Sequence, residues 1–212
     1  MESEITDIGS AVSVEPIKKN RIRVRAEGAN VQRCKTLVCV LENPTNLCNI
    51  TGVIRTADGV GVGKIYIISK QKFIYENWQD IRTDPKWISL SASASKWVYI
   101  KKFETTAECL AHLEKKNFTN IATSPHILGK DNISLTDGQY TQHHLAVWFG
   151  NESSGLSNEA LLACKQCVQI PMCGIIESLN LCTCAGIVLF HIANQRRKKY
   201  MLKSQHSSTI LT

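Results

Sequence analysis

The sequence predicts an α/β domain built on a mostly parallel sheet, and three observations support this class. Short apolar runs typical of buried strands alternate along the chain with segments whose apolar residues recur at helical spacing. The 212 residues are enough to bury a core, and 43% apolar and 20% charged residues are ordinary for a globular protein. No apolar run approaches the roughly 20 residues that a membrane span needs, so we expect no membrane segment.

Five strands are expected, each of them a short apolar run. The first run is followed by Asn43-Pro44-Thr45-Asn46, whose residue types are typical of a turn. This first run, 36–41, is short and apolar, so a buried strand is expected there, and the run that ends at Phe149 is followed by Gly150-Asn151-Glu152. The strands are predicted at 36–41, 65–68, 118–123, 145–149 and 168–171.

Four helices are expected between and after these strands. Residues 50, 53, 54 and 57 are apolar, which is the spacing of one helix face, and Ala107, Leu110, Ala111 and Leu113 repeat this spacing. The helices are predicted at 50–60, 105–116, 158–164 and 181–199. The stretch 70–95 is polar and aromatic and shows no clear period. Because strands alternate with helices, we expect crossover connections and parallel pairing.

The chain divides into an arm, a domain and a tail. Residues 1–35 are polar and acidic at first and then basic, residues 36–200 hold the alternating pattern, and residues 201–212 form a tail that we expect to be flexible. Lysine and arginine outnumber aspartate and glutamate by 25 to 18, and the net charge of +7 suits a polyanionic partner without requiring one. The basic part of the arm is either a phosphate-binding segment or a solvated surface.

The compartment is predicted from the N-terminus and the cysteines. The N-terminus is acidic and no apolar segment follows it, which excludes a secretory signal peptide. Nine cysteines are an odd number, and we interpret them as the reduced thiols of a cytoplasmic protein rather than as a disulfide framework.

Three familiar motifs are disfavoured by their context. The glycine-rich segment 58–63 resembles a nucleotide-binding loop, but it follows a helical pattern and precedes a strand, so a helix-ending turn is favoured. Cys164 and Cys167 have no second ligand pair at usable spacing, so we expect structural cysteines and no metal. The six histidines are dispersed and Gly-x-Ser-x-Gly is absent, so a hydrolytic triad is unsupported.

Three polar clusters lie in or against apolar segments, and they are harder to explain as ordinary solvent-exposed residues. Arg55 stands in an apolar helical segment six residues after Asn49, and an arginine in such a place needs an anionic partner. A second cluster, 150–155, directly follows a strand, and a third, 174–180, opens the last helix. Ser178 or Asn180 could simply cap that helix. Because ligands bind at the carboxyl ends of strands in α/β sheets, the three clusters together favour one shared site.

The same residues carry a resemblance to a known family. The motifs Asn49-x5-Arg55-Thr56-Ala57-Asp58, Phe149-Gly150-Asn151-Glu152-x-x-Gly155-Leu156-Ser157 and Ile170-Pro171-Met172-x-Gly174-x3-Ser178-Leu179-Asn180 resemble the three motifs of the SpoU branch of the SPOUT RNA methyltransferases. Their order and spacing also match, over about residues 36–200. Within the branch the chain is most similar to the TrmH family of tRNA (guanosine-18 2′-O) methyltransferases.

The resemblance implies a fold, a cofactor and an assembly. Members of the family have an α/β domain with a C-terminal trefoil knot, form homodimers and bind S-adenosylmethionine within the knot. By matching position, the cofactor would contact Thr123, Gly150, Asn151, Ile170, Met172, Gly174, Leu179 and Leu181. The family resemblance places Arg55 at the attacking ribose hydroxyl, with Asn49 and Glu152 orienting it and Ser178 and Asn180 shaping the surrounding loops.

RNA would bind through phosphate contacts, which position it without reading its bases. The residues expected to make these contacts are Arg21, Arg23, Arg25, Arg33, Arg196, Arg197, Lys198 and Lys199. The family usually has a helical arm at its N-terminus, whereas residues 1–30 show only a weak helical pattern. Three alternatives stay open: the same chemistry on ribosomal RNA or another tRNA position, an inactive RNA-binding relative, and a Rossmann-type methyltransferase.

Overall fold

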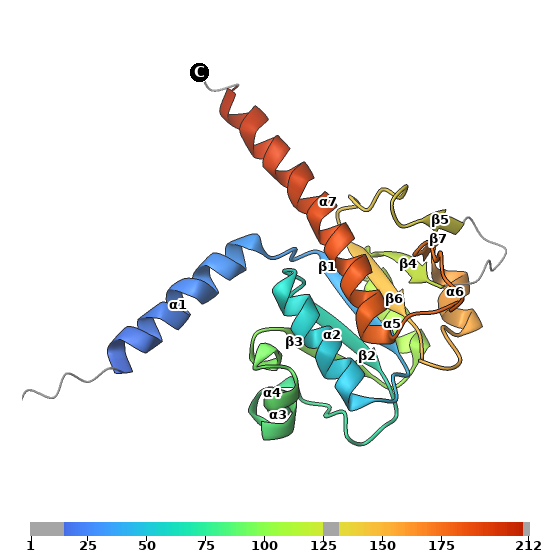
Figure 1. Ribbon diagram of the computed structural model, residues 1–212, viewed down its shortest axis with the longest axis horizontal. Coiled ribbons are helices and arrows are strands. Elements are labelled where there is room, and N and C mark those ends of the chain that lie inside the picture. The colour runs from blue at the N-terminus through green and yellow to red at the C-terminus, as the bar shows by residue number, and fades with distance from the viewer. Residues whose placement is uncertain (1–14, 125–131, 210–212) are drawn as a thin grey trace, which may run out of the picture. The chain divides into compact units, whose positions relative to one another are not determined.

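The computed structural model describes residues 15–124 and 132–209, and it divides the chain into two compact units at Gln32 (Figure 1). The first unit contributes one helix, α1 (Glu15–Gln32). The second unit, from Arg33 onward, carries the sheet and every candidate site residue outside the arm.

The second unit is built on a seven-stranded sheet with the order β3-β2-β1-β6-β4-β7-β5. All its pairings are parallel, so the predicted parallel α/β sheet is confirmed. The two strands at its centre, β1 and β6, are buried along their whole length, because helices cover both faces of a parallel sheet. The strands are β1 (Leu37–Glu42), β2 (Lys64–Ile68), β3 (Tyr99–Phe103), β4 (Thr119–Thr123), β5 (Asn132–Ser134), β6 (Leu145–Phe149) and β7 (Gln166–Gln169).

Helices cover both faces of this sheet (Figure 1). On one face lie α2 (Leu47–Gly59), α7 (Leu181–Thr209), α3 (Trp78–Thr83), α4 (Pro85–Leu90) and the short 3₁₀ helix η1 (Ala94–Lys96). On the other face lie α5 (Thr106–Glu114) and α6 (Asn158–Ala163). Alternate residues of β1 serve the two cores: Cys39 and Leu41 pack toward α2 and α7, and Val38 and Val40 toward α5.

The pair α2 and α7 is the main helix contact of the second unit, and a glycine permits its close approach. A Cβ on Gly52 would lie 2.7 Å from the Cys182 sulfur, so a larger residue would require the Cys182 side chain or the helix to shift. This packing sets the first turn of α7 beside α2, and both of these segments carry predicted site residues.

The turn at residues 58–63 confirms the helix-ending interpretation. Gly61 has a φ of +79°, and the backbone N–H of Val62 donates to the Ala57 carbonyl at 2.7 Å, closing the end of α2 before β2 begins. The nucleotide-loop alternative is wrong, because these glycines lie at the amino end of β2, away from the edge where parallel sheets bind ligands.

The structure adds elements that the pattern did not predict. α3, α4 and η1 occupy the stretch 70–95, and each is at most six residues long, which is too short to show a period. α1 is a regular helix in a stretch where the sequence showed only a weak helical pattern, and residues 1–14 lie outside the described residues. α7 runs on to Thr209, so a helix occupies most of the predicted tail, and residues 210–212 are again outside the description. None of the described helices is long and apolar enough to span a membrane.

Candidate functional site

The predicted site residues gather at one edge of the sheet. Because the strands are parallel, β1, β6, β4 and β7 all end at this edge, and the segments that follow β1, β6 and β7 carry the three motifs. The strand order places the β1 and β6 ends next to each other, with the β4 and β7 ends beyond them. Motifs that lie far apart in sequence therefore meet.

Side chains from all three motifs form one hydrogen-bonded line. The Asn180 amide donates to Asn49 Oδ1 at 3.0 Å, and the Asn49 amide donates to Glu152 Oε1 at 2.9 Å. The other carboxylate oxygen of Glu152 accepts from the backbone N–H and the hydroxyl of Thr45, at 3.1 and 3.0 Å. The line joins the starts of α2 and α7 to the loop after β6.

Asn180 serves this line and caps a helix at the same time. Its Oδ1 accepts from the backbone N–H of Cys182 at 2.9 Å, which satisfies one of the open donors at the start of α7. Its amide nitrogen is thereby turned toward Asn49. Capping and site formation were alternatives in the sequence, and the structure shows both for this residue.

Glu152 is held as a carboxylate. Burial alone would raise its pKa, but the hydrogen bonds donated by Asn49 and Thr45 outweigh burial and hold the pKa of Glu152 below its usual value. Every group that contacts its oxygens is a donor. Glu152 therefore orients its neighbours, and it is a poor candidate for accepting a proton at neutral pH.

The loop after β6 is tightly folded and depends on Gly150. A Cβ there would lie 2.2 Å from the Gly155 carbonyl carbon, so only glycine fits. Asn151 and Gly155 exchange backbone hydrogen bonds, and Asn151 Oδ1 accepts from the N–H of Ser153 at 2.9 Å. The Asn151 amide donates to the Asn43 carbonyl at 2.7 Å, which ties the loop to the end of β1.

Glu42, which the sequence reasoning missed, anchors the far end of this loop. Its side chain is 1% exposed, and its carboxylate accepts from Ser157 N at 2.8 Å, from Ser157 Oγ at 2.7 Å and from the Thr106 hydroxyl. A buried carboxylate needs such donors. The signal that could have found it is a lone acidic residue that ends the buried run of β1.

Arg55 lies on the exposed side of α2 and does not join the line. Six residues separate it from Asn49, which is about 9 Å along a helix axis. Within the part of the chain that the structure describes, its guanidinium has no hydrogen-bond or ion-pair partner. The anionic partner that the sequence called for is therefore not another described residue.

A cavity opens beside the line, over the ends of β4 and β7. Four of the predicted cofactor residues line it, and so does the predicted Ser178. Burial raises the pKa of the Cys184 thiol to about 11, so this wall residue is uncharged. The full lining is Thr123, Ser124, Val168, Ile170, Met172, Glu177, Ser178, Leu179, Cys184 and Val188.

This lining suits S-adenosylmethionine. Val168, Ile170, Leu179 and Val188 offer apolar surface for a purine ring, and Glu177 and Ser178 offer polar groups for its sugar and amino-acid ends. The other four predicted cofactor residues are not among these lining residues. Gly150 and Asn151 lie in the neighbouring loop, Gly174 is exposed, and Leu181 packs into the core.

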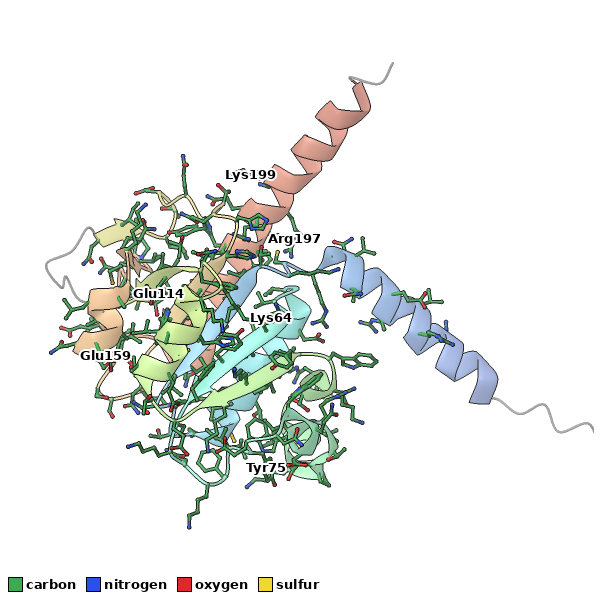
Figure 2. All side chains as sticks on the ribbon, turned by 180° about the vertical axis from the view of Figure 1, so that it is seen from behind. Lys64, Tyr75, Glu114, Glu159, Arg197 and Lys199 are labelled. Atoms are coloured by element: carbon green, nitrogen blue, oxygen red, sulfur yellow. The ribbon has the colours of Figure 1, made fainter. Side chains whose placement is uncertain are left out.

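The predicted RNA-binding residues have several different surroundings. On α1, Arg21, Arg23 and Arg25 are exposed, and Arg23 pairs with Glu27 at 3.9 Å. In the second unit Arg33 forms an ion pair with Asp58. On α7, Arg197 donates to the Val60 carbonyl and Lys199 donates to Thr141; both residues are labelled in Figure 2. Lys198, between them, is exposed.

The prediction for Arg196 is wrong. Its side chain is 1% exposed and donates to the carbonyls of Tyr140 at 3.1 Å and His143 at 3.0 Å, and to the Thr36 hydroxyl at 2.7 Å. It ties α7 to the segments that precede β1 and β6. A buried guanidinium that is satisfied by carbonyls has a structural role and is not accessible to an RNA phosphate.

The cysteines are part of the packing. Cys164 and Cys167 are buried in the core under α5 and α6, and none of the nine cysteines forms a disulfide bond. In the described ranges, no three or more histidine, cysteine, aspartate or glutamate side chains gather as metal ligands would.

Comparison with known proteins agrees with this geometry. The tRNA (guanosine(18)-2′-O)-methyltransferase of Thermus thermophilus is 31% identical over 83% of this chain and 84% of its own length. The crystal structure of the Aquifex aeolicus TrmH/SpoU tRNA modifying enzyme matches with a TM-score of 0.71 and 26% identity, over 87% of both chains. The SpoU methyltransferase AviRb from Streptomyces viridochromogenes, in complex with AdoMet, matches with a TM-score of 0.65 and 25% identity, over 77% of this chain and 62% of AviRb. Residues 36–190 match the model of the SpoU rRNA Methylase family, and the chain belongs to that family.

Proposed function

We propose that this protein is an S-adenosylmethionine-dependent RNA ribose 2′-O-methyltransferase that acts on guanosine 18 of tRNA. One observation carries the proposal: side chains of all three motifs converge through the Asn180–Asn49–Glu152 line, beside a cavity with the lining that the cofactor requires. The relatives named for the tRNA reaction support the choice of substrate.

The cofactor supplies an electrophilic methyl group on a sulfonium sulfur. Thr123, Ile170, Met172, Ser178 and Leu179 would hold it over the ends of β4 and β7. Gly150, Asn151, Gly174 and Leu181 shape the loops and the helix start around that place. Holding the methyl carbon in line with the ribose oxygen lowers the barrier, since orientation is supplied before the reaction.

Arg55 acts on the ribose. The 2′-oxygen attacks the methyl carbon, the carbon–sulfur bond breaks, and the hydroxyl proton must leave. A guanidinium gives up its proton only with great difficulty, so an arginine such as Arg55 is a poor general base. Its free donors instead bind the RNA phosphate and stabilise the negative charge that develops on the oxygen. The proton goes to a phosphate oxygen or to water.

The hydrogen-bonded line positions Arg55 relative to the residues that would hold the cofactor. Glu152 cannot usefully take the proton, because its low pKa and its four donors keep it a carboxylate. It fixes the start of α2 through Thr45 and Asn49, and thereby the helix that carries Arg55. Asn180 ties the same point to α7, so that the cofactor loop and Arg55 keep a constant spacing.

Phosphate contacts would bind the RNA. The candidates are the exposed Arg21, Arg23 and Arg25 of α1 and Lys198 of α7. Arg33, Arg197 and Lys199 already donate to protein groups but keep further donors for a phosphate.

The assembly and the location follow the family. We place residues 36–200 in a domain with a C-terminal trefoil knot, supported by the return of β6 to a position between β1 and β4. We propose a homodimer, supported by the exposed apolar side chains Ile187 and Phe190 on α7. We propose a cytoplasmic location, supported by nine cysteines that are all free thiols.

Nucleoside mass spectrometry tests the function. Purified protein and S-adenosylmethionine are incubated with an unmodified tRNA transcript, with ribosomal RNA, and with the same tRNA carrying a 2′-deoxy residue at position 18. We expect 2′-O-methylguanosine in the tRNA alone, and none after the 2′-deoxy change.

The Arg55→Ala variant is the control, because it removes the guanidinium that stabilises the developing charge and leaves the residues that line the cavity unchanged. It should bind the cofactor in calorimetry and form no product. Product in ribosomal RNA, or at another tRNA position, would replace guanosine 18 of tRNA as the proposed substrate. Cofactor binding without product in any RNA would contradict the proposed substrate class, and no binding at all would favour an inactive RNA-binding relative.

A further inference from the structure

A second cavity lies at the same edge of the sheet, over the ends of β2 and β3. It is lined by Asn43, Ile68, Ser69, Lys70, Gln71, Glu104, Thr105 and Thr106. Neither the cofactor nor the three motifs account for it. Along the edge, the strand order sets the cofactor cavity over β4 and β7, the hydrogen-bonded line over β6 and β1, and this cavity over β2 and β3.

Asn43 connects the wall of this cavity to the loop that carries Glu152. This residue lines the cavity, and its carbonyl accepts the amide of Asn151, the neighbour of Glu152. Its φ of +49° is a left-handed conformation, held by that bond and by its own N–H to Ile68 O at 2.9 Å. Neighbouring strands are about 4.8 Å apart, so the cavity begins within about 10 Å of the end of β6.

Polar side chains without partners surround the opening. Asn43, Lys70, Gln71 and Glu104 each bring a side-chain polar group, and among the described residues none of these groups has a hydrogen-bond partner. One lining residue, Thr106, is by contrast held in place, because its hydroxyl donates to the buried Glu42. A fixed wall residue beside free donors and acceptors suits a ligand site.

We propose that this cavity binds the guanine base of the nucleotide whose ribose is methylated; the inference rests on the proposed function. The Watson–Crick edge of guanine presents two N–H donors beside the O6 acceptor. The carboxylate of Glu104 is an acceptor only and takes the donors, and Lys70 donates to O6. Asn43 and Gln71 can form hydrogen bonds with the remaining polar groups of the base.

The charges favour a guanine over the other ligands that RNA offers. Adenine presents an acceptor, N1, where guanine presents N1–H, so the Glu104 carboxylate would repel it. A phosphate would be attracted by Lys70 but would also meet this carboxylate. The cavity thus reads the base, while the arginines and lysines elsewhere bind the backbone.

The test compares two substrates and two glutamate variants. The full chain is assayed on tRNA transcripts with guanosine or adenosine at position 18, and the ratio of kcat/KM for the two is the readout. Glu104→Gln replaces the carboxylate with an amide, which can donate to adenine N1. Glu114→Gln removes an exposed carboxylate from the last turn of α5, labelled in Figure 2, and is the matched control.

We expect Glu104→Gln to lose about tenfold to a hundredfold in kcat/KM on the guanosine substrate, as for one charge-assisted hydrogen bond. The guanosine-to-adenosine ratio should fall about tenfold or more, with calorimetric cofactor affinity unchanged and Glu114→Gln equal to wild type. This inference alone is overturned if the variant is active and its guanosine-to-adenosine ratio of kcat/KM is unchanged. It is also overturned if kcat/KM rises equally on both substrates, as it would if Glu104 lay beside an RNA phosphate. A wild type that methylates no ribose overturns the proposed function as well.

Discussion

Arg55 is exposed and has no partner among the described residues, whereas the residues of the hydrogen-bonded line are all paired. That contrast predicts the outcome of Arg55→Lys. A lysine keeps the charge but loses the planar fork that binds phosphate and oxygen together. We expect kcat to fall by about a hundredfold or more, as when a transition-state donor is removed. Single-turnover methylation rates measure this, and a variant within about threefold of wild type would contradict the role.

Glu152 supports a prediction about stability and pH. Its pKa in the folded chain lies below the unfolded value of 4.5, so its contribution is present above about pH 4.5 and is lost as the pH falls through the folded pKa. Glu152→Gln should therefore be less stable than wild type at pH 7, and the two should converge once the pH falls below the folded pKa of Glu152. Urea unfolding of both proteins at several pH values checks this. If their unfolding free energies differed by the same amount at every pH, the ionisation of Glu152 would not contribute to stability.

At the scale of elements, the buried carboxylate of Glu42 joins β1 to α5 and to the loop before α6. Glu42→Ala would leave the buried hydroxyl of Thr106 and the half-buried donors of Ser157 without their acceptor. We expect a loss of about 3 kcal/mol in unfolding free energy, typical of hydrogen bonds to a charged group that is removed from a buried site. Chemical denaturation measures it.

The control for Glu42 is Glu114→Ala, because this glutamate is exposed on α5. It should change stability by less than about 0.5 kcal/mol. The stabilised loop also carries Glu152, so Glu42→Ala should lower kcat for methylation more than it raises the KM for the cofactor. A stability loss without any kinetic change would limit Glu42 to folding.

The sequence predicted the elements whose patterns are long or wholly apolar. β6 and all of β1 except its last residue, Glu42, are continuous apolar runs, and α2 and α5 repeat at helical spacing, so their boundaries shift by only a few residues. β3 was missed because Lys101 and Lys102 interrupt it near the sheet edge, and β5 because it has three residues. Local pattern cannot signal pairing that only the sheet supplies.

The site shows the same division between local pattern and tertiary structure. Asn49, Glu152 and Asn180 were expected together because parallel strands end at one edge, and the structure joins them. Glu42 and Arg196 were not placed in the interior from the sequence, since charged residues are usually solvated. Only the three-dimensional contacts reveal the donors around Glu42 and the carbonyls around Arg196.

At the scale of the whole molecule, α7 leaves Ile187 and Phe190 40% and 56% exposed on a helix whose other face is in the core. Burying such side chains against a second copy would remove apolar surface from water, which drives association. We therefore expect sedimentation equilibrium to give twice the chain mass of 23.6 kDa for the wild type.

The double variant Ile187→Asp and Phe190→Asp tests this assembly, because two carboxylates would lose their hydration at the interface. It should sediment as a monomer with an unchanged far-UV circular dichroism spectrum. Leu162→Asp, which changes a 75% exposed leucine on the opposite face of the sheet, should stay dimeric. A dimeric double variant would place the interface elsewhere. A wild type that is monomeric at micromolar concentration would remove the homodimer from the proposal, and the hydrogen-bonded line, which lies within one chain, would then be the complete positioning device.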